Sequence, residues 1–385
     1  MMNSKLVPKR RFKEFESDGE WEQKNLSSIA DIRDGTHSSP KYLEVGHPFI
    51  TSKNVANGFI SFEDIQYISN EDFNEINKRS KVDVHDILMG MIGTVGNLAL
   101  IRQTPFFAIK NVALIKYTGD VDYEFLYQAL QTSNVNRQLK DSIDGGTQKF
   151  ISLKKIRNLN IPFSNISEQL KIGKFFQTID LLIQLHQHKL DKLKNLKKAY
   201  LTEMFPAEGE CVPKRRFPGF EGEWEQRKLG DIVEINSGKD YKHLIEGEVP
   251  VYGTGGYMLS VSEALSYRDG IGIGRKGTID KPYILRAPFW TVDTLFYCVP
   301  KEKDDLQFVN AIFERINWRS YDESTGVPSL SKVIINNIQV FSSCIDEQRT
   351  IGDFLLKVEK QISLQQQKLD KLNDLKKAYL NELFV

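Results

Sequence analysis

The chain has little of what several common protein classes require. It has only three cysteines among 385 residues, Cys211, Cys298 and Cys344, and they lie far apart in the sequence. An odd number of scattered cysteines does not suit a disulfide framework or a CxxC-type metal site. We therefore expect all three to be structural thiols.

Long apolar segments are also missing. The longest one, 87–101, is interrupted by three glycines and an asparagine, and it is shorter than a membrane-spanning helix needs to be. The opening segment MMNSKLVPKRRF is basic and lacks the apolar core of a secretory signal. These absences predict a cytoplasmic protein with no membrane partner.

Signatures of catalysis are scarce as well. Segment 272–278, GIGRKGT, has the glycines of a phosphate-binding loop but lacks the Lys-Ser/Thr pair that follows the last one. No GxGxxG links an expected strand to a helix, and GxSxG does not occur. The closest histidines, His186 and His188, point to different faces of an expected helix and make a poor metal site. We predict a non-catalytic chain without a metal.

Net charge gives no overall sign of nucleic-acid binding, because it is only +1, with a pI near 7.6. Basic clusters occur locally at 9–11, 189–198 and 214–216, and a solvated surface is the simpler interpretation of each one. A hydrophobic content of 40% and a charged content of 27% are ordinary for a globular protein. The length predicts two or three domains.

What the chain does contain is a repeat. Segments 185–205, LHQHKLDKLKNLKKAYLTEMF, and 364–384, LQQQKLDKLNDLKKAYLNELF, agree at most of their positions. VPKRRF occurs at 7–12 and again at 212–217, and each copy leads into GEWEQ. The sequence therefore consists of two half-proteins in tandem, which share a frame and differ in what the frame holds.

Apolar residues recur every three or four positions through both repeated blocks, from about 165 to 205 and from 344 to 384. This pattern predicts two long helices that pair as an antiparallel coiled coil, with the halves related by a pseudo-twofold axis. Asn165 and Glu168 have the spacing of a capping box, and Pro206 should end the first helix. A helix of about 38 residues spans roughly 57 Å, which suits a spacer.

The dissimilar regions predict compact α+β domains with small curved sheets. Short apolar runs separated by Gly, Asn and Pro indicate strands, and two amphipathic stretches indicate short helices. The expected strands are 66–68, 112–117, 249–252, 283–285 and 295–299, and the expected helices are 125–139 and 306–316. The predicted organisation is a first domain at 1–163, a central helix at 164–210, a second domain at 211–343 and a C-terminal helix at 344–385.

Polar loops at equivalent places in the two halves suggest that each domain binds a different ligand. DGTHSSP at 34–40 and SGKDY at 237–241 both follow similar apolar patterns, and glycine-containing loops at 93–97 and 274–278 would let a phosphate approach the backbone. Drift in solvent-exposed loops is the alternative explanation. The candidate binding residues are Thr36, His37, Ser38, Lys53, Asn54, Lys149, Lys239, Tyr241, Thr254, Arg275 and Lys276.

The order of these motifs resembles a known family. A frame, a variable region with DGTHSSP, a helix that opens with Glu-Gln-x-x-Ile-Gly and continues into KLDKLKNLKKAYLTEMF, and then the frame again, are similar to the specificity (S) subunit of type I restriction–modification systems, the HsdS family. The resemblance covers essentially the whole chain. It implies target recognition domains near 20–163 and 223–341, each reading half of a split DNA sequence through the candidate residues.

The resemblance also implies partners. The long helices would dock two methyltransferase (M) subunits, and the candidate docking residues are Leu193, Leu196, Tyr200, Leu372, Leu375 and Tyr379. S-adenosylmethionine for adenine-N6 methylation would be bound by the M subunits, and ATP and Mg by restriction (R) subunits, so that this chain binds no cofactor itself. A coiled-coil scaffold that presents two ligand-binding domains without DNA is the alternative, and an enzyme with an unrecognised site is a third.

The helices would then act as a ruler for the DNA target. Half-sites in successive major grooves are about 34 Å apart, a distance that a rigid helix pair could set. We expect deletion of matched segments within 189–194 and 368–373 to change the gap between half-sites.

Overall fold

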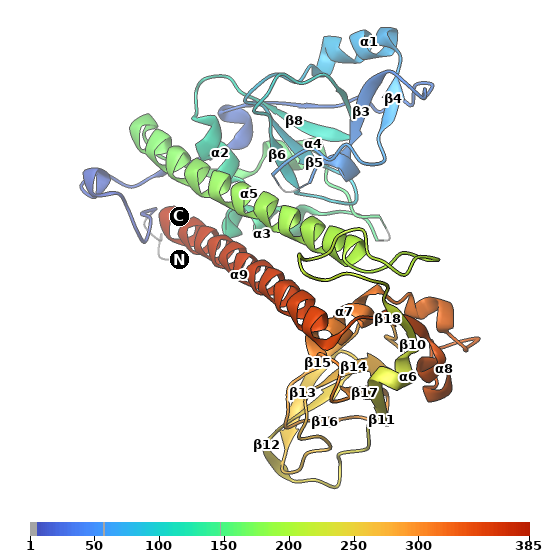
Figure 1. Ribbon diagram of the computed structural model, residues 1–385. Helices are drawn as coiled ribbons and strands as arrows, with labels where there is room; N and C mark the ends of the chain where they lie inside the picture. The colour runs from blue at the N-terminus through green and yellow to red at the C-terminus, as the bar shows by residue number, and fades with distance from the viewer. Residues whose placement is uncertain (1–5, 57, 147) are drawn as a thin grey trace. The chain divides into compact units, whose positions relative to one another are not determined.

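The computed structural model describes residues 6–56, 58–146 and 148–385, and Figure 1 labels their helices and strands. The chain forms two compact units. Unit 1 holds the described residues up to His186 together with Lys368–Val385, and unit 2 is Gln187–Gln367. Within the described residues, no helix is both long enough and apolar enough to cross a membrane.

The two long helices predicted from the repeat are confirmed as α5 (Ile166–Glu203) and α9 (Ile345–Leu383). The expected capping box at the start of α5 is only half correct. Asn165 Oδ1 accepts a hydrogen bond from the Glu168 backbone N–H at 2.9 Å, as predicted. The Glu168 carboxylate does not return to the N-cap, because it binds Arg11 and Trp21 instead.

Segments of α5 and α9 pack antiparallel in unit 1. The rings of Phe175 and Tyr379 have centroids 5.0 Å apart, and Asp180 pairs with Lys376 at 2.8 Å. Residue numbers thus rise along one helix as they fall along the other.

Unit 2 pairs other segments of the same helices in the same sense. Its contacts are Tyr200 with Phe354, at 4.7 Å between ring centroids, and Lys197 with Glu359 at 2.7 Å. The predicted antiparallel pairing is therefore confirmed within each unit.

Unit 1 contains three small sheets, as expected for an α+β domain. The largest has the strand order β2-β8-β5-β6, the second β4-β3-β7 and the third β1-β9, and only the β3–β7 pair is parallel among these described strands. The strands are β1 (Glu22–Asn25), β2 (Asp31–Asp34), β3 (His47–Thr51), β4 (Gln66–Ile68), β5 (Ile87–Gly90), β6 (Leu98–Leu100), β7 (Ala108–Lys110), β8 (Val112–Lys116) and β9 (Asn160–Phe163).

Unit 2 repeats this topology with different residues. Its sheets have the orders β11-β17-β14-β15, β13-β12-β16 and β10-β18, and again one described pair, β12–β16, is parallel. The strands are β10 (Glu225–Lys228), β11 (Val233–Ser237), β12 (Glu246–Gly253), β13 (Gly256–Val261), β14 (Gly270–Gly274), β15 (Tyr283–Leu285), β16 (Trp290–Thr291), β17 (Leu295–Pro300) and β18 (Gln339–Ser342). All five predicted strand segments are confirmed.

The short helices match the predictions less well. The second predicted helix is confirmed as α7 (Leu306–Arg315), but the first, 125–139, is wrong because it is two helices, α2 (Tyr123–Ala129) and α3 (Ser133–Ser142). Thr132 breaks the run, since its hydroxyl donates to the Ala129 carbonyl and accepts from the Val135 N–H as an N-cap. Shorter helices are α4 (Leu153–Arg157), α6 (Leu229–Ile232) and α8 (Lys332–Asn337).

The segment between β4 and β5 of unit 1 contains a helix that has no counterpart at the same place among the described residues of unit 2. The polar segment α1 (Asn70–Ser80) lies between β4 and β5, and Ser69 caps its start by accepting from the Asp72 N–H at 3.0 Å. The corresponding segment of unit 2, between β13 and β14, contains no helix in the structure described. The two domains thus share sheets and differ in an inserted helix.

The core of each domain is closed by the end of the other repeat's helix. Leu383 and Phe384 at the end of α9 are buried in the unit 1 core, where Phe384 meets the Trp21 ring at 5.9 Å. Phe205, just beyond α5, is buried in the unit 2 core and meets the Trp224 ring at 5.6 Å. For this reason the compact units do not follow the order of segments along the chain.

Candidate nucleic-acid interface

The Glu-Gln-x-x-Ile-Gly segment at the start of each long helix holds a buried ion pair. Glu168 is fully buried and accepts from Arg11 at 2.6 and 2.7 Å and from Trp21 Nε1 at 3.0 Å. In unit 2, Glu347 accepts from Arg216 at 2.7 and 2.8 Å. The hydrogen bond to Glu168 raises the pKa of Arg11. The motif links the repeated VPKRRF arm to the helix.

The same segment fixes the first turn of a neighbouring helix. Gln169 accepts from the Asp122 backbone N–H at 3.1 Å and donates to the Ser164 carbonyl at 2.6 Å. A Cβ at Gly173 would lie 2.3 Å from Asp122 Oδ1, so only glycine fits there. Gln348 and Gly352 hold Asp305 in the same way in unit 2. The motif is therefore a packing device.

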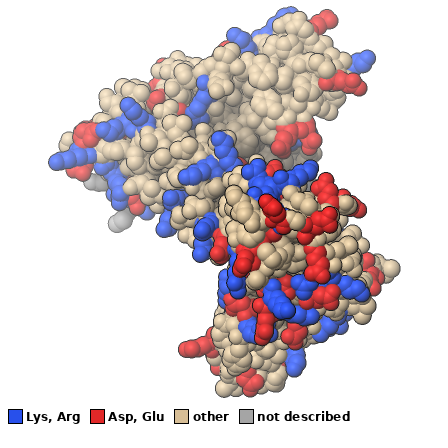
Figure 2. All heavy atoms as spheres, viewed as in Figure 1, with Lys and Arg blue, Asp and Glu red and all other residues tan. Residues whose placement is uncertain are grey.

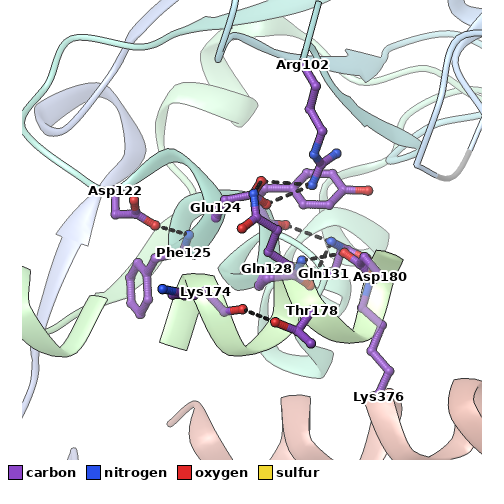
Figure 3. A network of polar contacts seen from close by, with 12 residues as sticks. Arg102, Asp122, Glu124, Phe125, Gln128, Gln131, Lys174, Thr178, Asp180 and Lys376 are labelled. Atoms are coloured by element: carbon purple, nitrogen blue, oxygen red, sulfur yellow. Dashed lines mark hydrogen bonds and ion pairs between the residues drawn. The ribbon is translucent and has the colours of Figure 1, made fainter. Parts of the chain in front are cut away.

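Deeper in unit 1, a polar network joins the sheet domain to both helices (Figure 3). Arg102, in the loop after β6, binds the Glu124 carboxylate of α2 at 2.8 and 3.0 Å. Gln128, also on α2, donates to Asp180 of α5 at 2.8 Å, and Asp180 pairs with Lys376 of α9. Burial is the main reason that the pKa of Glu124 is raised.

Unit 2 has a simpler version of this network. Lys197 of α5 bridges Glu314 of α7 at 2.8 Å and Glu359 of α9 at 2.7 Å. In both units the lysine comes from the helix of the other repeat, so each domain is tied to both helices. These ion pairs position the domains on the helices.

Backbone hydrogen bonds gather several loops of unit 1 into one group, which we call the first loop cluster (residues 34–40, 52–54, 91–97, 110–111 and 148–150). Asn111 N–H donates to the Thr36 carbonyl at 3.2 Å, and Ser52 Oγ donates to the Asn111 carbonyl at 2.7 Å. The Ile92 N–H donates to Ser52 Oγ at 3.2 Å, and the Gly93 N–H donates to the Lys149 carbonyl at 2.9 Å. Predicted residues that are far apart in sequence are thus brought together.

The side chains of this cluster are mostly available to a ligand. His37, Ser38, Lys53 and Lys149 are exposed, whereas Thr36 is half-buried and its hydroxyl accepts from the Ser38 N–H at 3.1 Å. An exposed Lys53 and Lys149 suit phosphate oxygens. The structure therefore leaves these predicted positions open to DNA.

Asn54 is the exception, and its prediction needs correction. Its side chain is buried, accepts from the Thr51 N–H at 3.0 Å and donates to the carbonyls of Ser61 and Glu63. The amide shapes the short helix Ser52–Asn54 and has no surface from which to read a base.

Unit 2 builds a second loop cluster (residues 237–241, 253–255, 274–278, 292–294 and 326–330) on an equivalent backbone. Lys239 N–H donates to the Thr291 carbonyl at 2.8 Å, which matches the Thr36 N–H bond to Ile109 at 3.0 Å in unit 1. The Arg275 N–H donates to the Thr294 carbonyl at 2.8 Å, and the Leu330 N–H donates to the Arg275 carbonyl at 3.0 Å. The predicted residues of the second half also meet at one place.

The second cluster also displays basic side chains, and one of them is an arginine. Lys239, Arg275 and Lys276 are exposed, and Thr254 is half-buried. Tyr241 is half-buried against the core around Val251 and Trp290, so its ring supports the cluster. Side chains of this kind can reach phosphate oxygens and guanine.

A loop beside Arg275 and Lys276 is held by one carboxylate. Asp322 Oδ1 accepts from the Ser329 and Ser324 backbone N–H groups at 2.9 and 3.0 Å and from the Ser324 hydroxyl at 2.8 Å. These bonds, chiefly that from Ser329, lower the pKa of Asp322. The Gly277 N–H donates to the Pro328 carbonyl of this loop at 2.8 Å.

Two polar residues that act at the first cluster, Arg79 and Asn111, were not predicted from the sequence, and Asp34 was predicted only as part of the DGTHSSP loop. Asp34, at the end of β2, is buried and contacts both His37 and Arg79 of α1, and Asn111 contacts His37. Asn111 interrupts the apolar run AIKNVALI, a signal that could have pointed to a turn. Arg79 had no local signal, because its partner lies far away in sequence.

Charge is mixed on the one face of the molecule that Figure 2 draws. Figure 2 shows Lys and Arg interspersed with Asp and Glu on the face it presents, without one continuous basic area. No group of three or more His, Cys, Asp or Glu side chains suited to a metal occurs among residues 6–56, 58–146 and 148–385.

The predicted docking residues divide into two groups. Tyr200 and Tyr379 are half-buried and pack against Phe354 and Phe175. Leu193 and Leu372 are half-buried. Leu196 and Leu375 occupy equivalent positions of the repeat and are each 43% exposed.

Comparison with known proteins identifies the family. The model of the type I restriction modification DNA specificity domain matches residues 18–195 and again residues 221–374. A crystal structure of the type I restriction–modification system S subunit from M. genitalium shares the fold, with a TM-score of 0.72 over 99% of both chains at 18% identity. A structure reported for complex assembly of a type I R-M system has a TM-score of 0.51, with 94% of this chain and 97% of that one covered at 15% identity.

Two curated relatives come from Methanocaldococcus jannaschii. The type I restriction enzyme MjaIX specificity subunit is 26% identical over 244 residues, which are 57% of this chain and 53% of the relative. The MjaVIII specificity subunit is 23% identical over 210 residues, covering 53% of this chain and 49% of the relative. The matched part thus spans about half the length of these relatives. With two copies of its domain covering most of the sequence, the chain belongs to the type I restriction–modification specificity subunit family.

Proposed function

We propose that this chain is the DNA sequence-specificity subunit of a type I restriction–modification complex and that it recognises a bipartite target. The observation that carries the proposal is the pair of loop clusters. They share a hydrogen-bonded backbone, yet one displays Thr36, His37 and Lys53 where the other displays Lys239, Thr254 and Arg275. Equal scaffolds with different polar side chains suit the reading of two different half-sites.

The chemistry of each cluster divides into two tasks. Exposed lysines, Lys53 and Lys149 in the first cluster and Lys239 in the second, would contact phosphates and set the register on the duplex. Arg275 could donate two hydrogen bonds to guanine O6 and N7, the commonest specific contact in a major groove. Replacing Arg275 should therefore relax one position of the second half-site.

The duplicated helices support docking of two identical partners. Exposed leucines recur in equivalent places, Leu185 with Leu364 and Leu196 with Leu375. A surface that occurs twice on one chain suits a partner that binds twice. We propose that two M subunits dock there, and that R subunits join the complex afterwards.

Chemistry would then belong to the partners. S-adenosylmethionine would be held by the M subunits and ATP with Mg by the R subunits, while this chain supplies recognition and no catalytic group. The complex would act on double-stranded DNA in the cytoplasm, as part of defence against foreign DNA.

The test is to co-express the chain with the M subunit of its own host and to sequence the methylated positions of the host DNA. We expect a motif of two short half-sites separated by a fixed gap, and footprinting of the purified complex should protect both halves. Leu196→Lys with Leu375→Lys should abolish copurification of the M subunit, whereas Lys194→Glu, a neighbouring exposed change, should not. Two domains that bind ligands other than DNA would contradict the proposal.

A further inference from the structure

Asn111 occupies an unusual position in the first loop cluster. It is the single residue between β7 and β8, where the chain passes from the three-stranded to the four-stranded sheet, and its φ is +52°. Asparagine tolerates this left-handed conformation better than most residues. Its N–H is bound to Thr36 and its carbonyl to Ser52. The backbone that carries this amide is therefore fixed on both sides.

The side chain of Asn111 is held as well. Its Oδ1 lies 2.6 Å from His37 Nδ1, and His37 Nε2 lies 2.9 Å from Asp34 Oδ2. Asp34 is buried, and its other oxygen accepts from the guanidinium of Arg79. Four side chains, Arg79, Asp34, His37 and Asn111, thus form a continuous polar chain that ends at the surface.

Helix α1 holds the Arg79 end of this chain in place. The Arg79 carbonyl accepts from Arg33 Nη1 at 3.3 Å, and the ring of Phe73 stacks on His47 of β3 at 3.9 Å. The helix is therefore fastened to β2 and β3. The inserted helix therefore supports the loop that follows β2.

Hydrogen-bonding capacity decides which residue of the chain can read a base. Both ring nitrogens of His37 face a partner, so the ring has no free polar atom. The Asn111 amide has four hydrogen-bonding positions, two on Oδ1 and two on Nδ2, and His37 uses one. Whichever way the amide is turned, an acceptor and a donor remain on its outer edge.

We propose that Asn111 is a specificity-determining residue that reads adenine in the first half-site, and that Arg79, Asp34 and His37 are positioning residues. Asparagine pairs with adenine by accepting from N6 and donating to N7 in the major groove. The inference rests on the proposed function, and it replaces His37 by Asn111 as the base-reading side chain of this loop. A fixed amide plane matters because two hydrogen bonds must form together.

The second loop cluster lacks this arrangement. Ser237 ends β11 as Asp34 ends β2, and both are followed by a glycine packed against the neighbouring backbone. Between β16 and β17 stand Val292, Asp293 and Thr294 in place of the single Asn111. The chain of four side chains is thus a property of the first recognition domain, and its loss should affect one half-site only.

Asn111→Gly is the variant that tests this inference, because glycine accepts a positive φ and removes the amide without strain. The complex of the full chain with M subunits should still methylate a bipartite motif. We expect one adenine of the first half-site to become degenerate, with preference at that position falling roughly tenfold or more, as expected for a lost bidentate contact. The second half-site and the gap should not change.

The positioning residues need a readout that a general loss of stability would not give. Arg79→Met and Asp34→Asn should relax the same adenine position as Asn111→Gly, with an unchanged second half-site. Lys78→Met is the matched control, since Lys78 neighbours Arg79 on α1 but pairs only with the exposed Glu75 among the described residues. It should leave the motif as it is.

The possible outcomes separate this inference from the function on which it rests. A wild-type complex that methylates no bipartite motif would contradict the proposed function itself. A wild-type bipartite motif that Asn111→Gly leaves unchanged at every position would overturn the inference alone, and so would relaxation at different positions in Asn111→Gly and Asp34→Asn.

Discussion

The helical frame and the loop clusters are both present twice, but they differ in how closely the two copies match. In the frame, Glu168 and Glu347 both bind an arginine, and Gly173 and Gly352 both receive a helix N-terminus. In the clusters the backbone bonds recur while the side chains change. A buried charge pair or a close backbone approach accepts few side chains, whereas an exposed loop accepts many.

The frame also differs between its copies at the buried tryptophan. Trp21 donates to Glu168, while the Nε1 of Trp224, equally buried, has no hydrogen-bond partner among the described residues. The first copy therefore has one more bond on its buried carboxylate. This difference offers a way to compare the two copies quantitatively.

The largest effect should come from shortening both helices together. Deleting 189–195 and 368–374 removes seven residues from each helix, about 10 Å, and keeps the apolar face in phase because seven residues make nearly two turns. We expect the gap in the methylated motif to shorten by about three base pairs, with both half-sites unchanged. A single-helix deletion is the control and should abolish methylation. An unchanged gap would contradict the role of the helices as a ruler.

Breaking the buried ion pairs should cost the most stability. Glu168→Ala leaves the buried Arg11 without its partner, and we expect a loss of about 3–5 kcal/mol in the free energy of unfolding. Glu347→Ala should cost about 1 kcal/mol less, because no bond from Trp224 is lost with it. Denaturant unfolding of the two variants measures the difference, and equal losses would show that the Trp21 bond contributes nothing.

Replacing the packed glycines of the frame by alanine should destabilise the protein less, and by similar amounts in the two units. A Cβ at Gly173 or Gly352 would lie within 2.5 Å of an aspartate oxygen, so Gly173→Ala and Gly352→Ala should each destabilise their unit by about 1–3 kcal/mol. Gly19→Ala is the control, since a Cβ added there would meet nothing within 4 Å and the backbone φ lies outside the left-handed region. Effects confined to one unit would show that the two copies do not pack alike.

The smallest effect concerns the loop held by Asp322 in the second cluster. Its backbone bonds lower the native pKa below the unfolded value of about 3.9, so the stabilisation is fully present above that pH and is lost as pH falls through the native pKa. Asp322→Asn should speed amide exchange in 322–329 at neutral pH. The variant should also no longer lose protection of these amides as the pH falls through the native pKa of Asp322. Amide exchange in the first cluster should not change. Equal exchange of 322–329 in the wild type and the variant would show that the carboxylate does not hold the loop.

Local patterns predicted the parts whose stabilising contacts repeat along the chain. The apolar stripe of α5 and α9 is long and regular, and β4 and β15 are bounded by turn residues, so these elements were identified correctly. The sequence NEDFNEINKRS of α1 has few apolar positions, which is why that helix was missed. The break at Thr132 was missed because its hydroxyl outweighs the helical pattern around it.

Contacts between distant segments could not be predicted in this way. Spacing suggested that Glu168 would cap its own helix, but Arg11 arrives from 157 residues away and offers a stronger, charge-assisted pair. The burial of Asn54 and the contact of Asp34 with Arg79 also depend on distant segments, so they could not be predicted from the local sequence. Exposure and partners decide the role of a loop residue, and neither follows from its local sequence.

The central claim is that each loop cluster reads its own half of the target on a shared frame. Its most direct test replaces residues 20–163 by the recognition domain of another family member and sequences the methylated motif of the resulting complex. We expect one half-site to change while the other half-site stays as in the wild type. A motif that changes in both halves, or in neither, would contradict it.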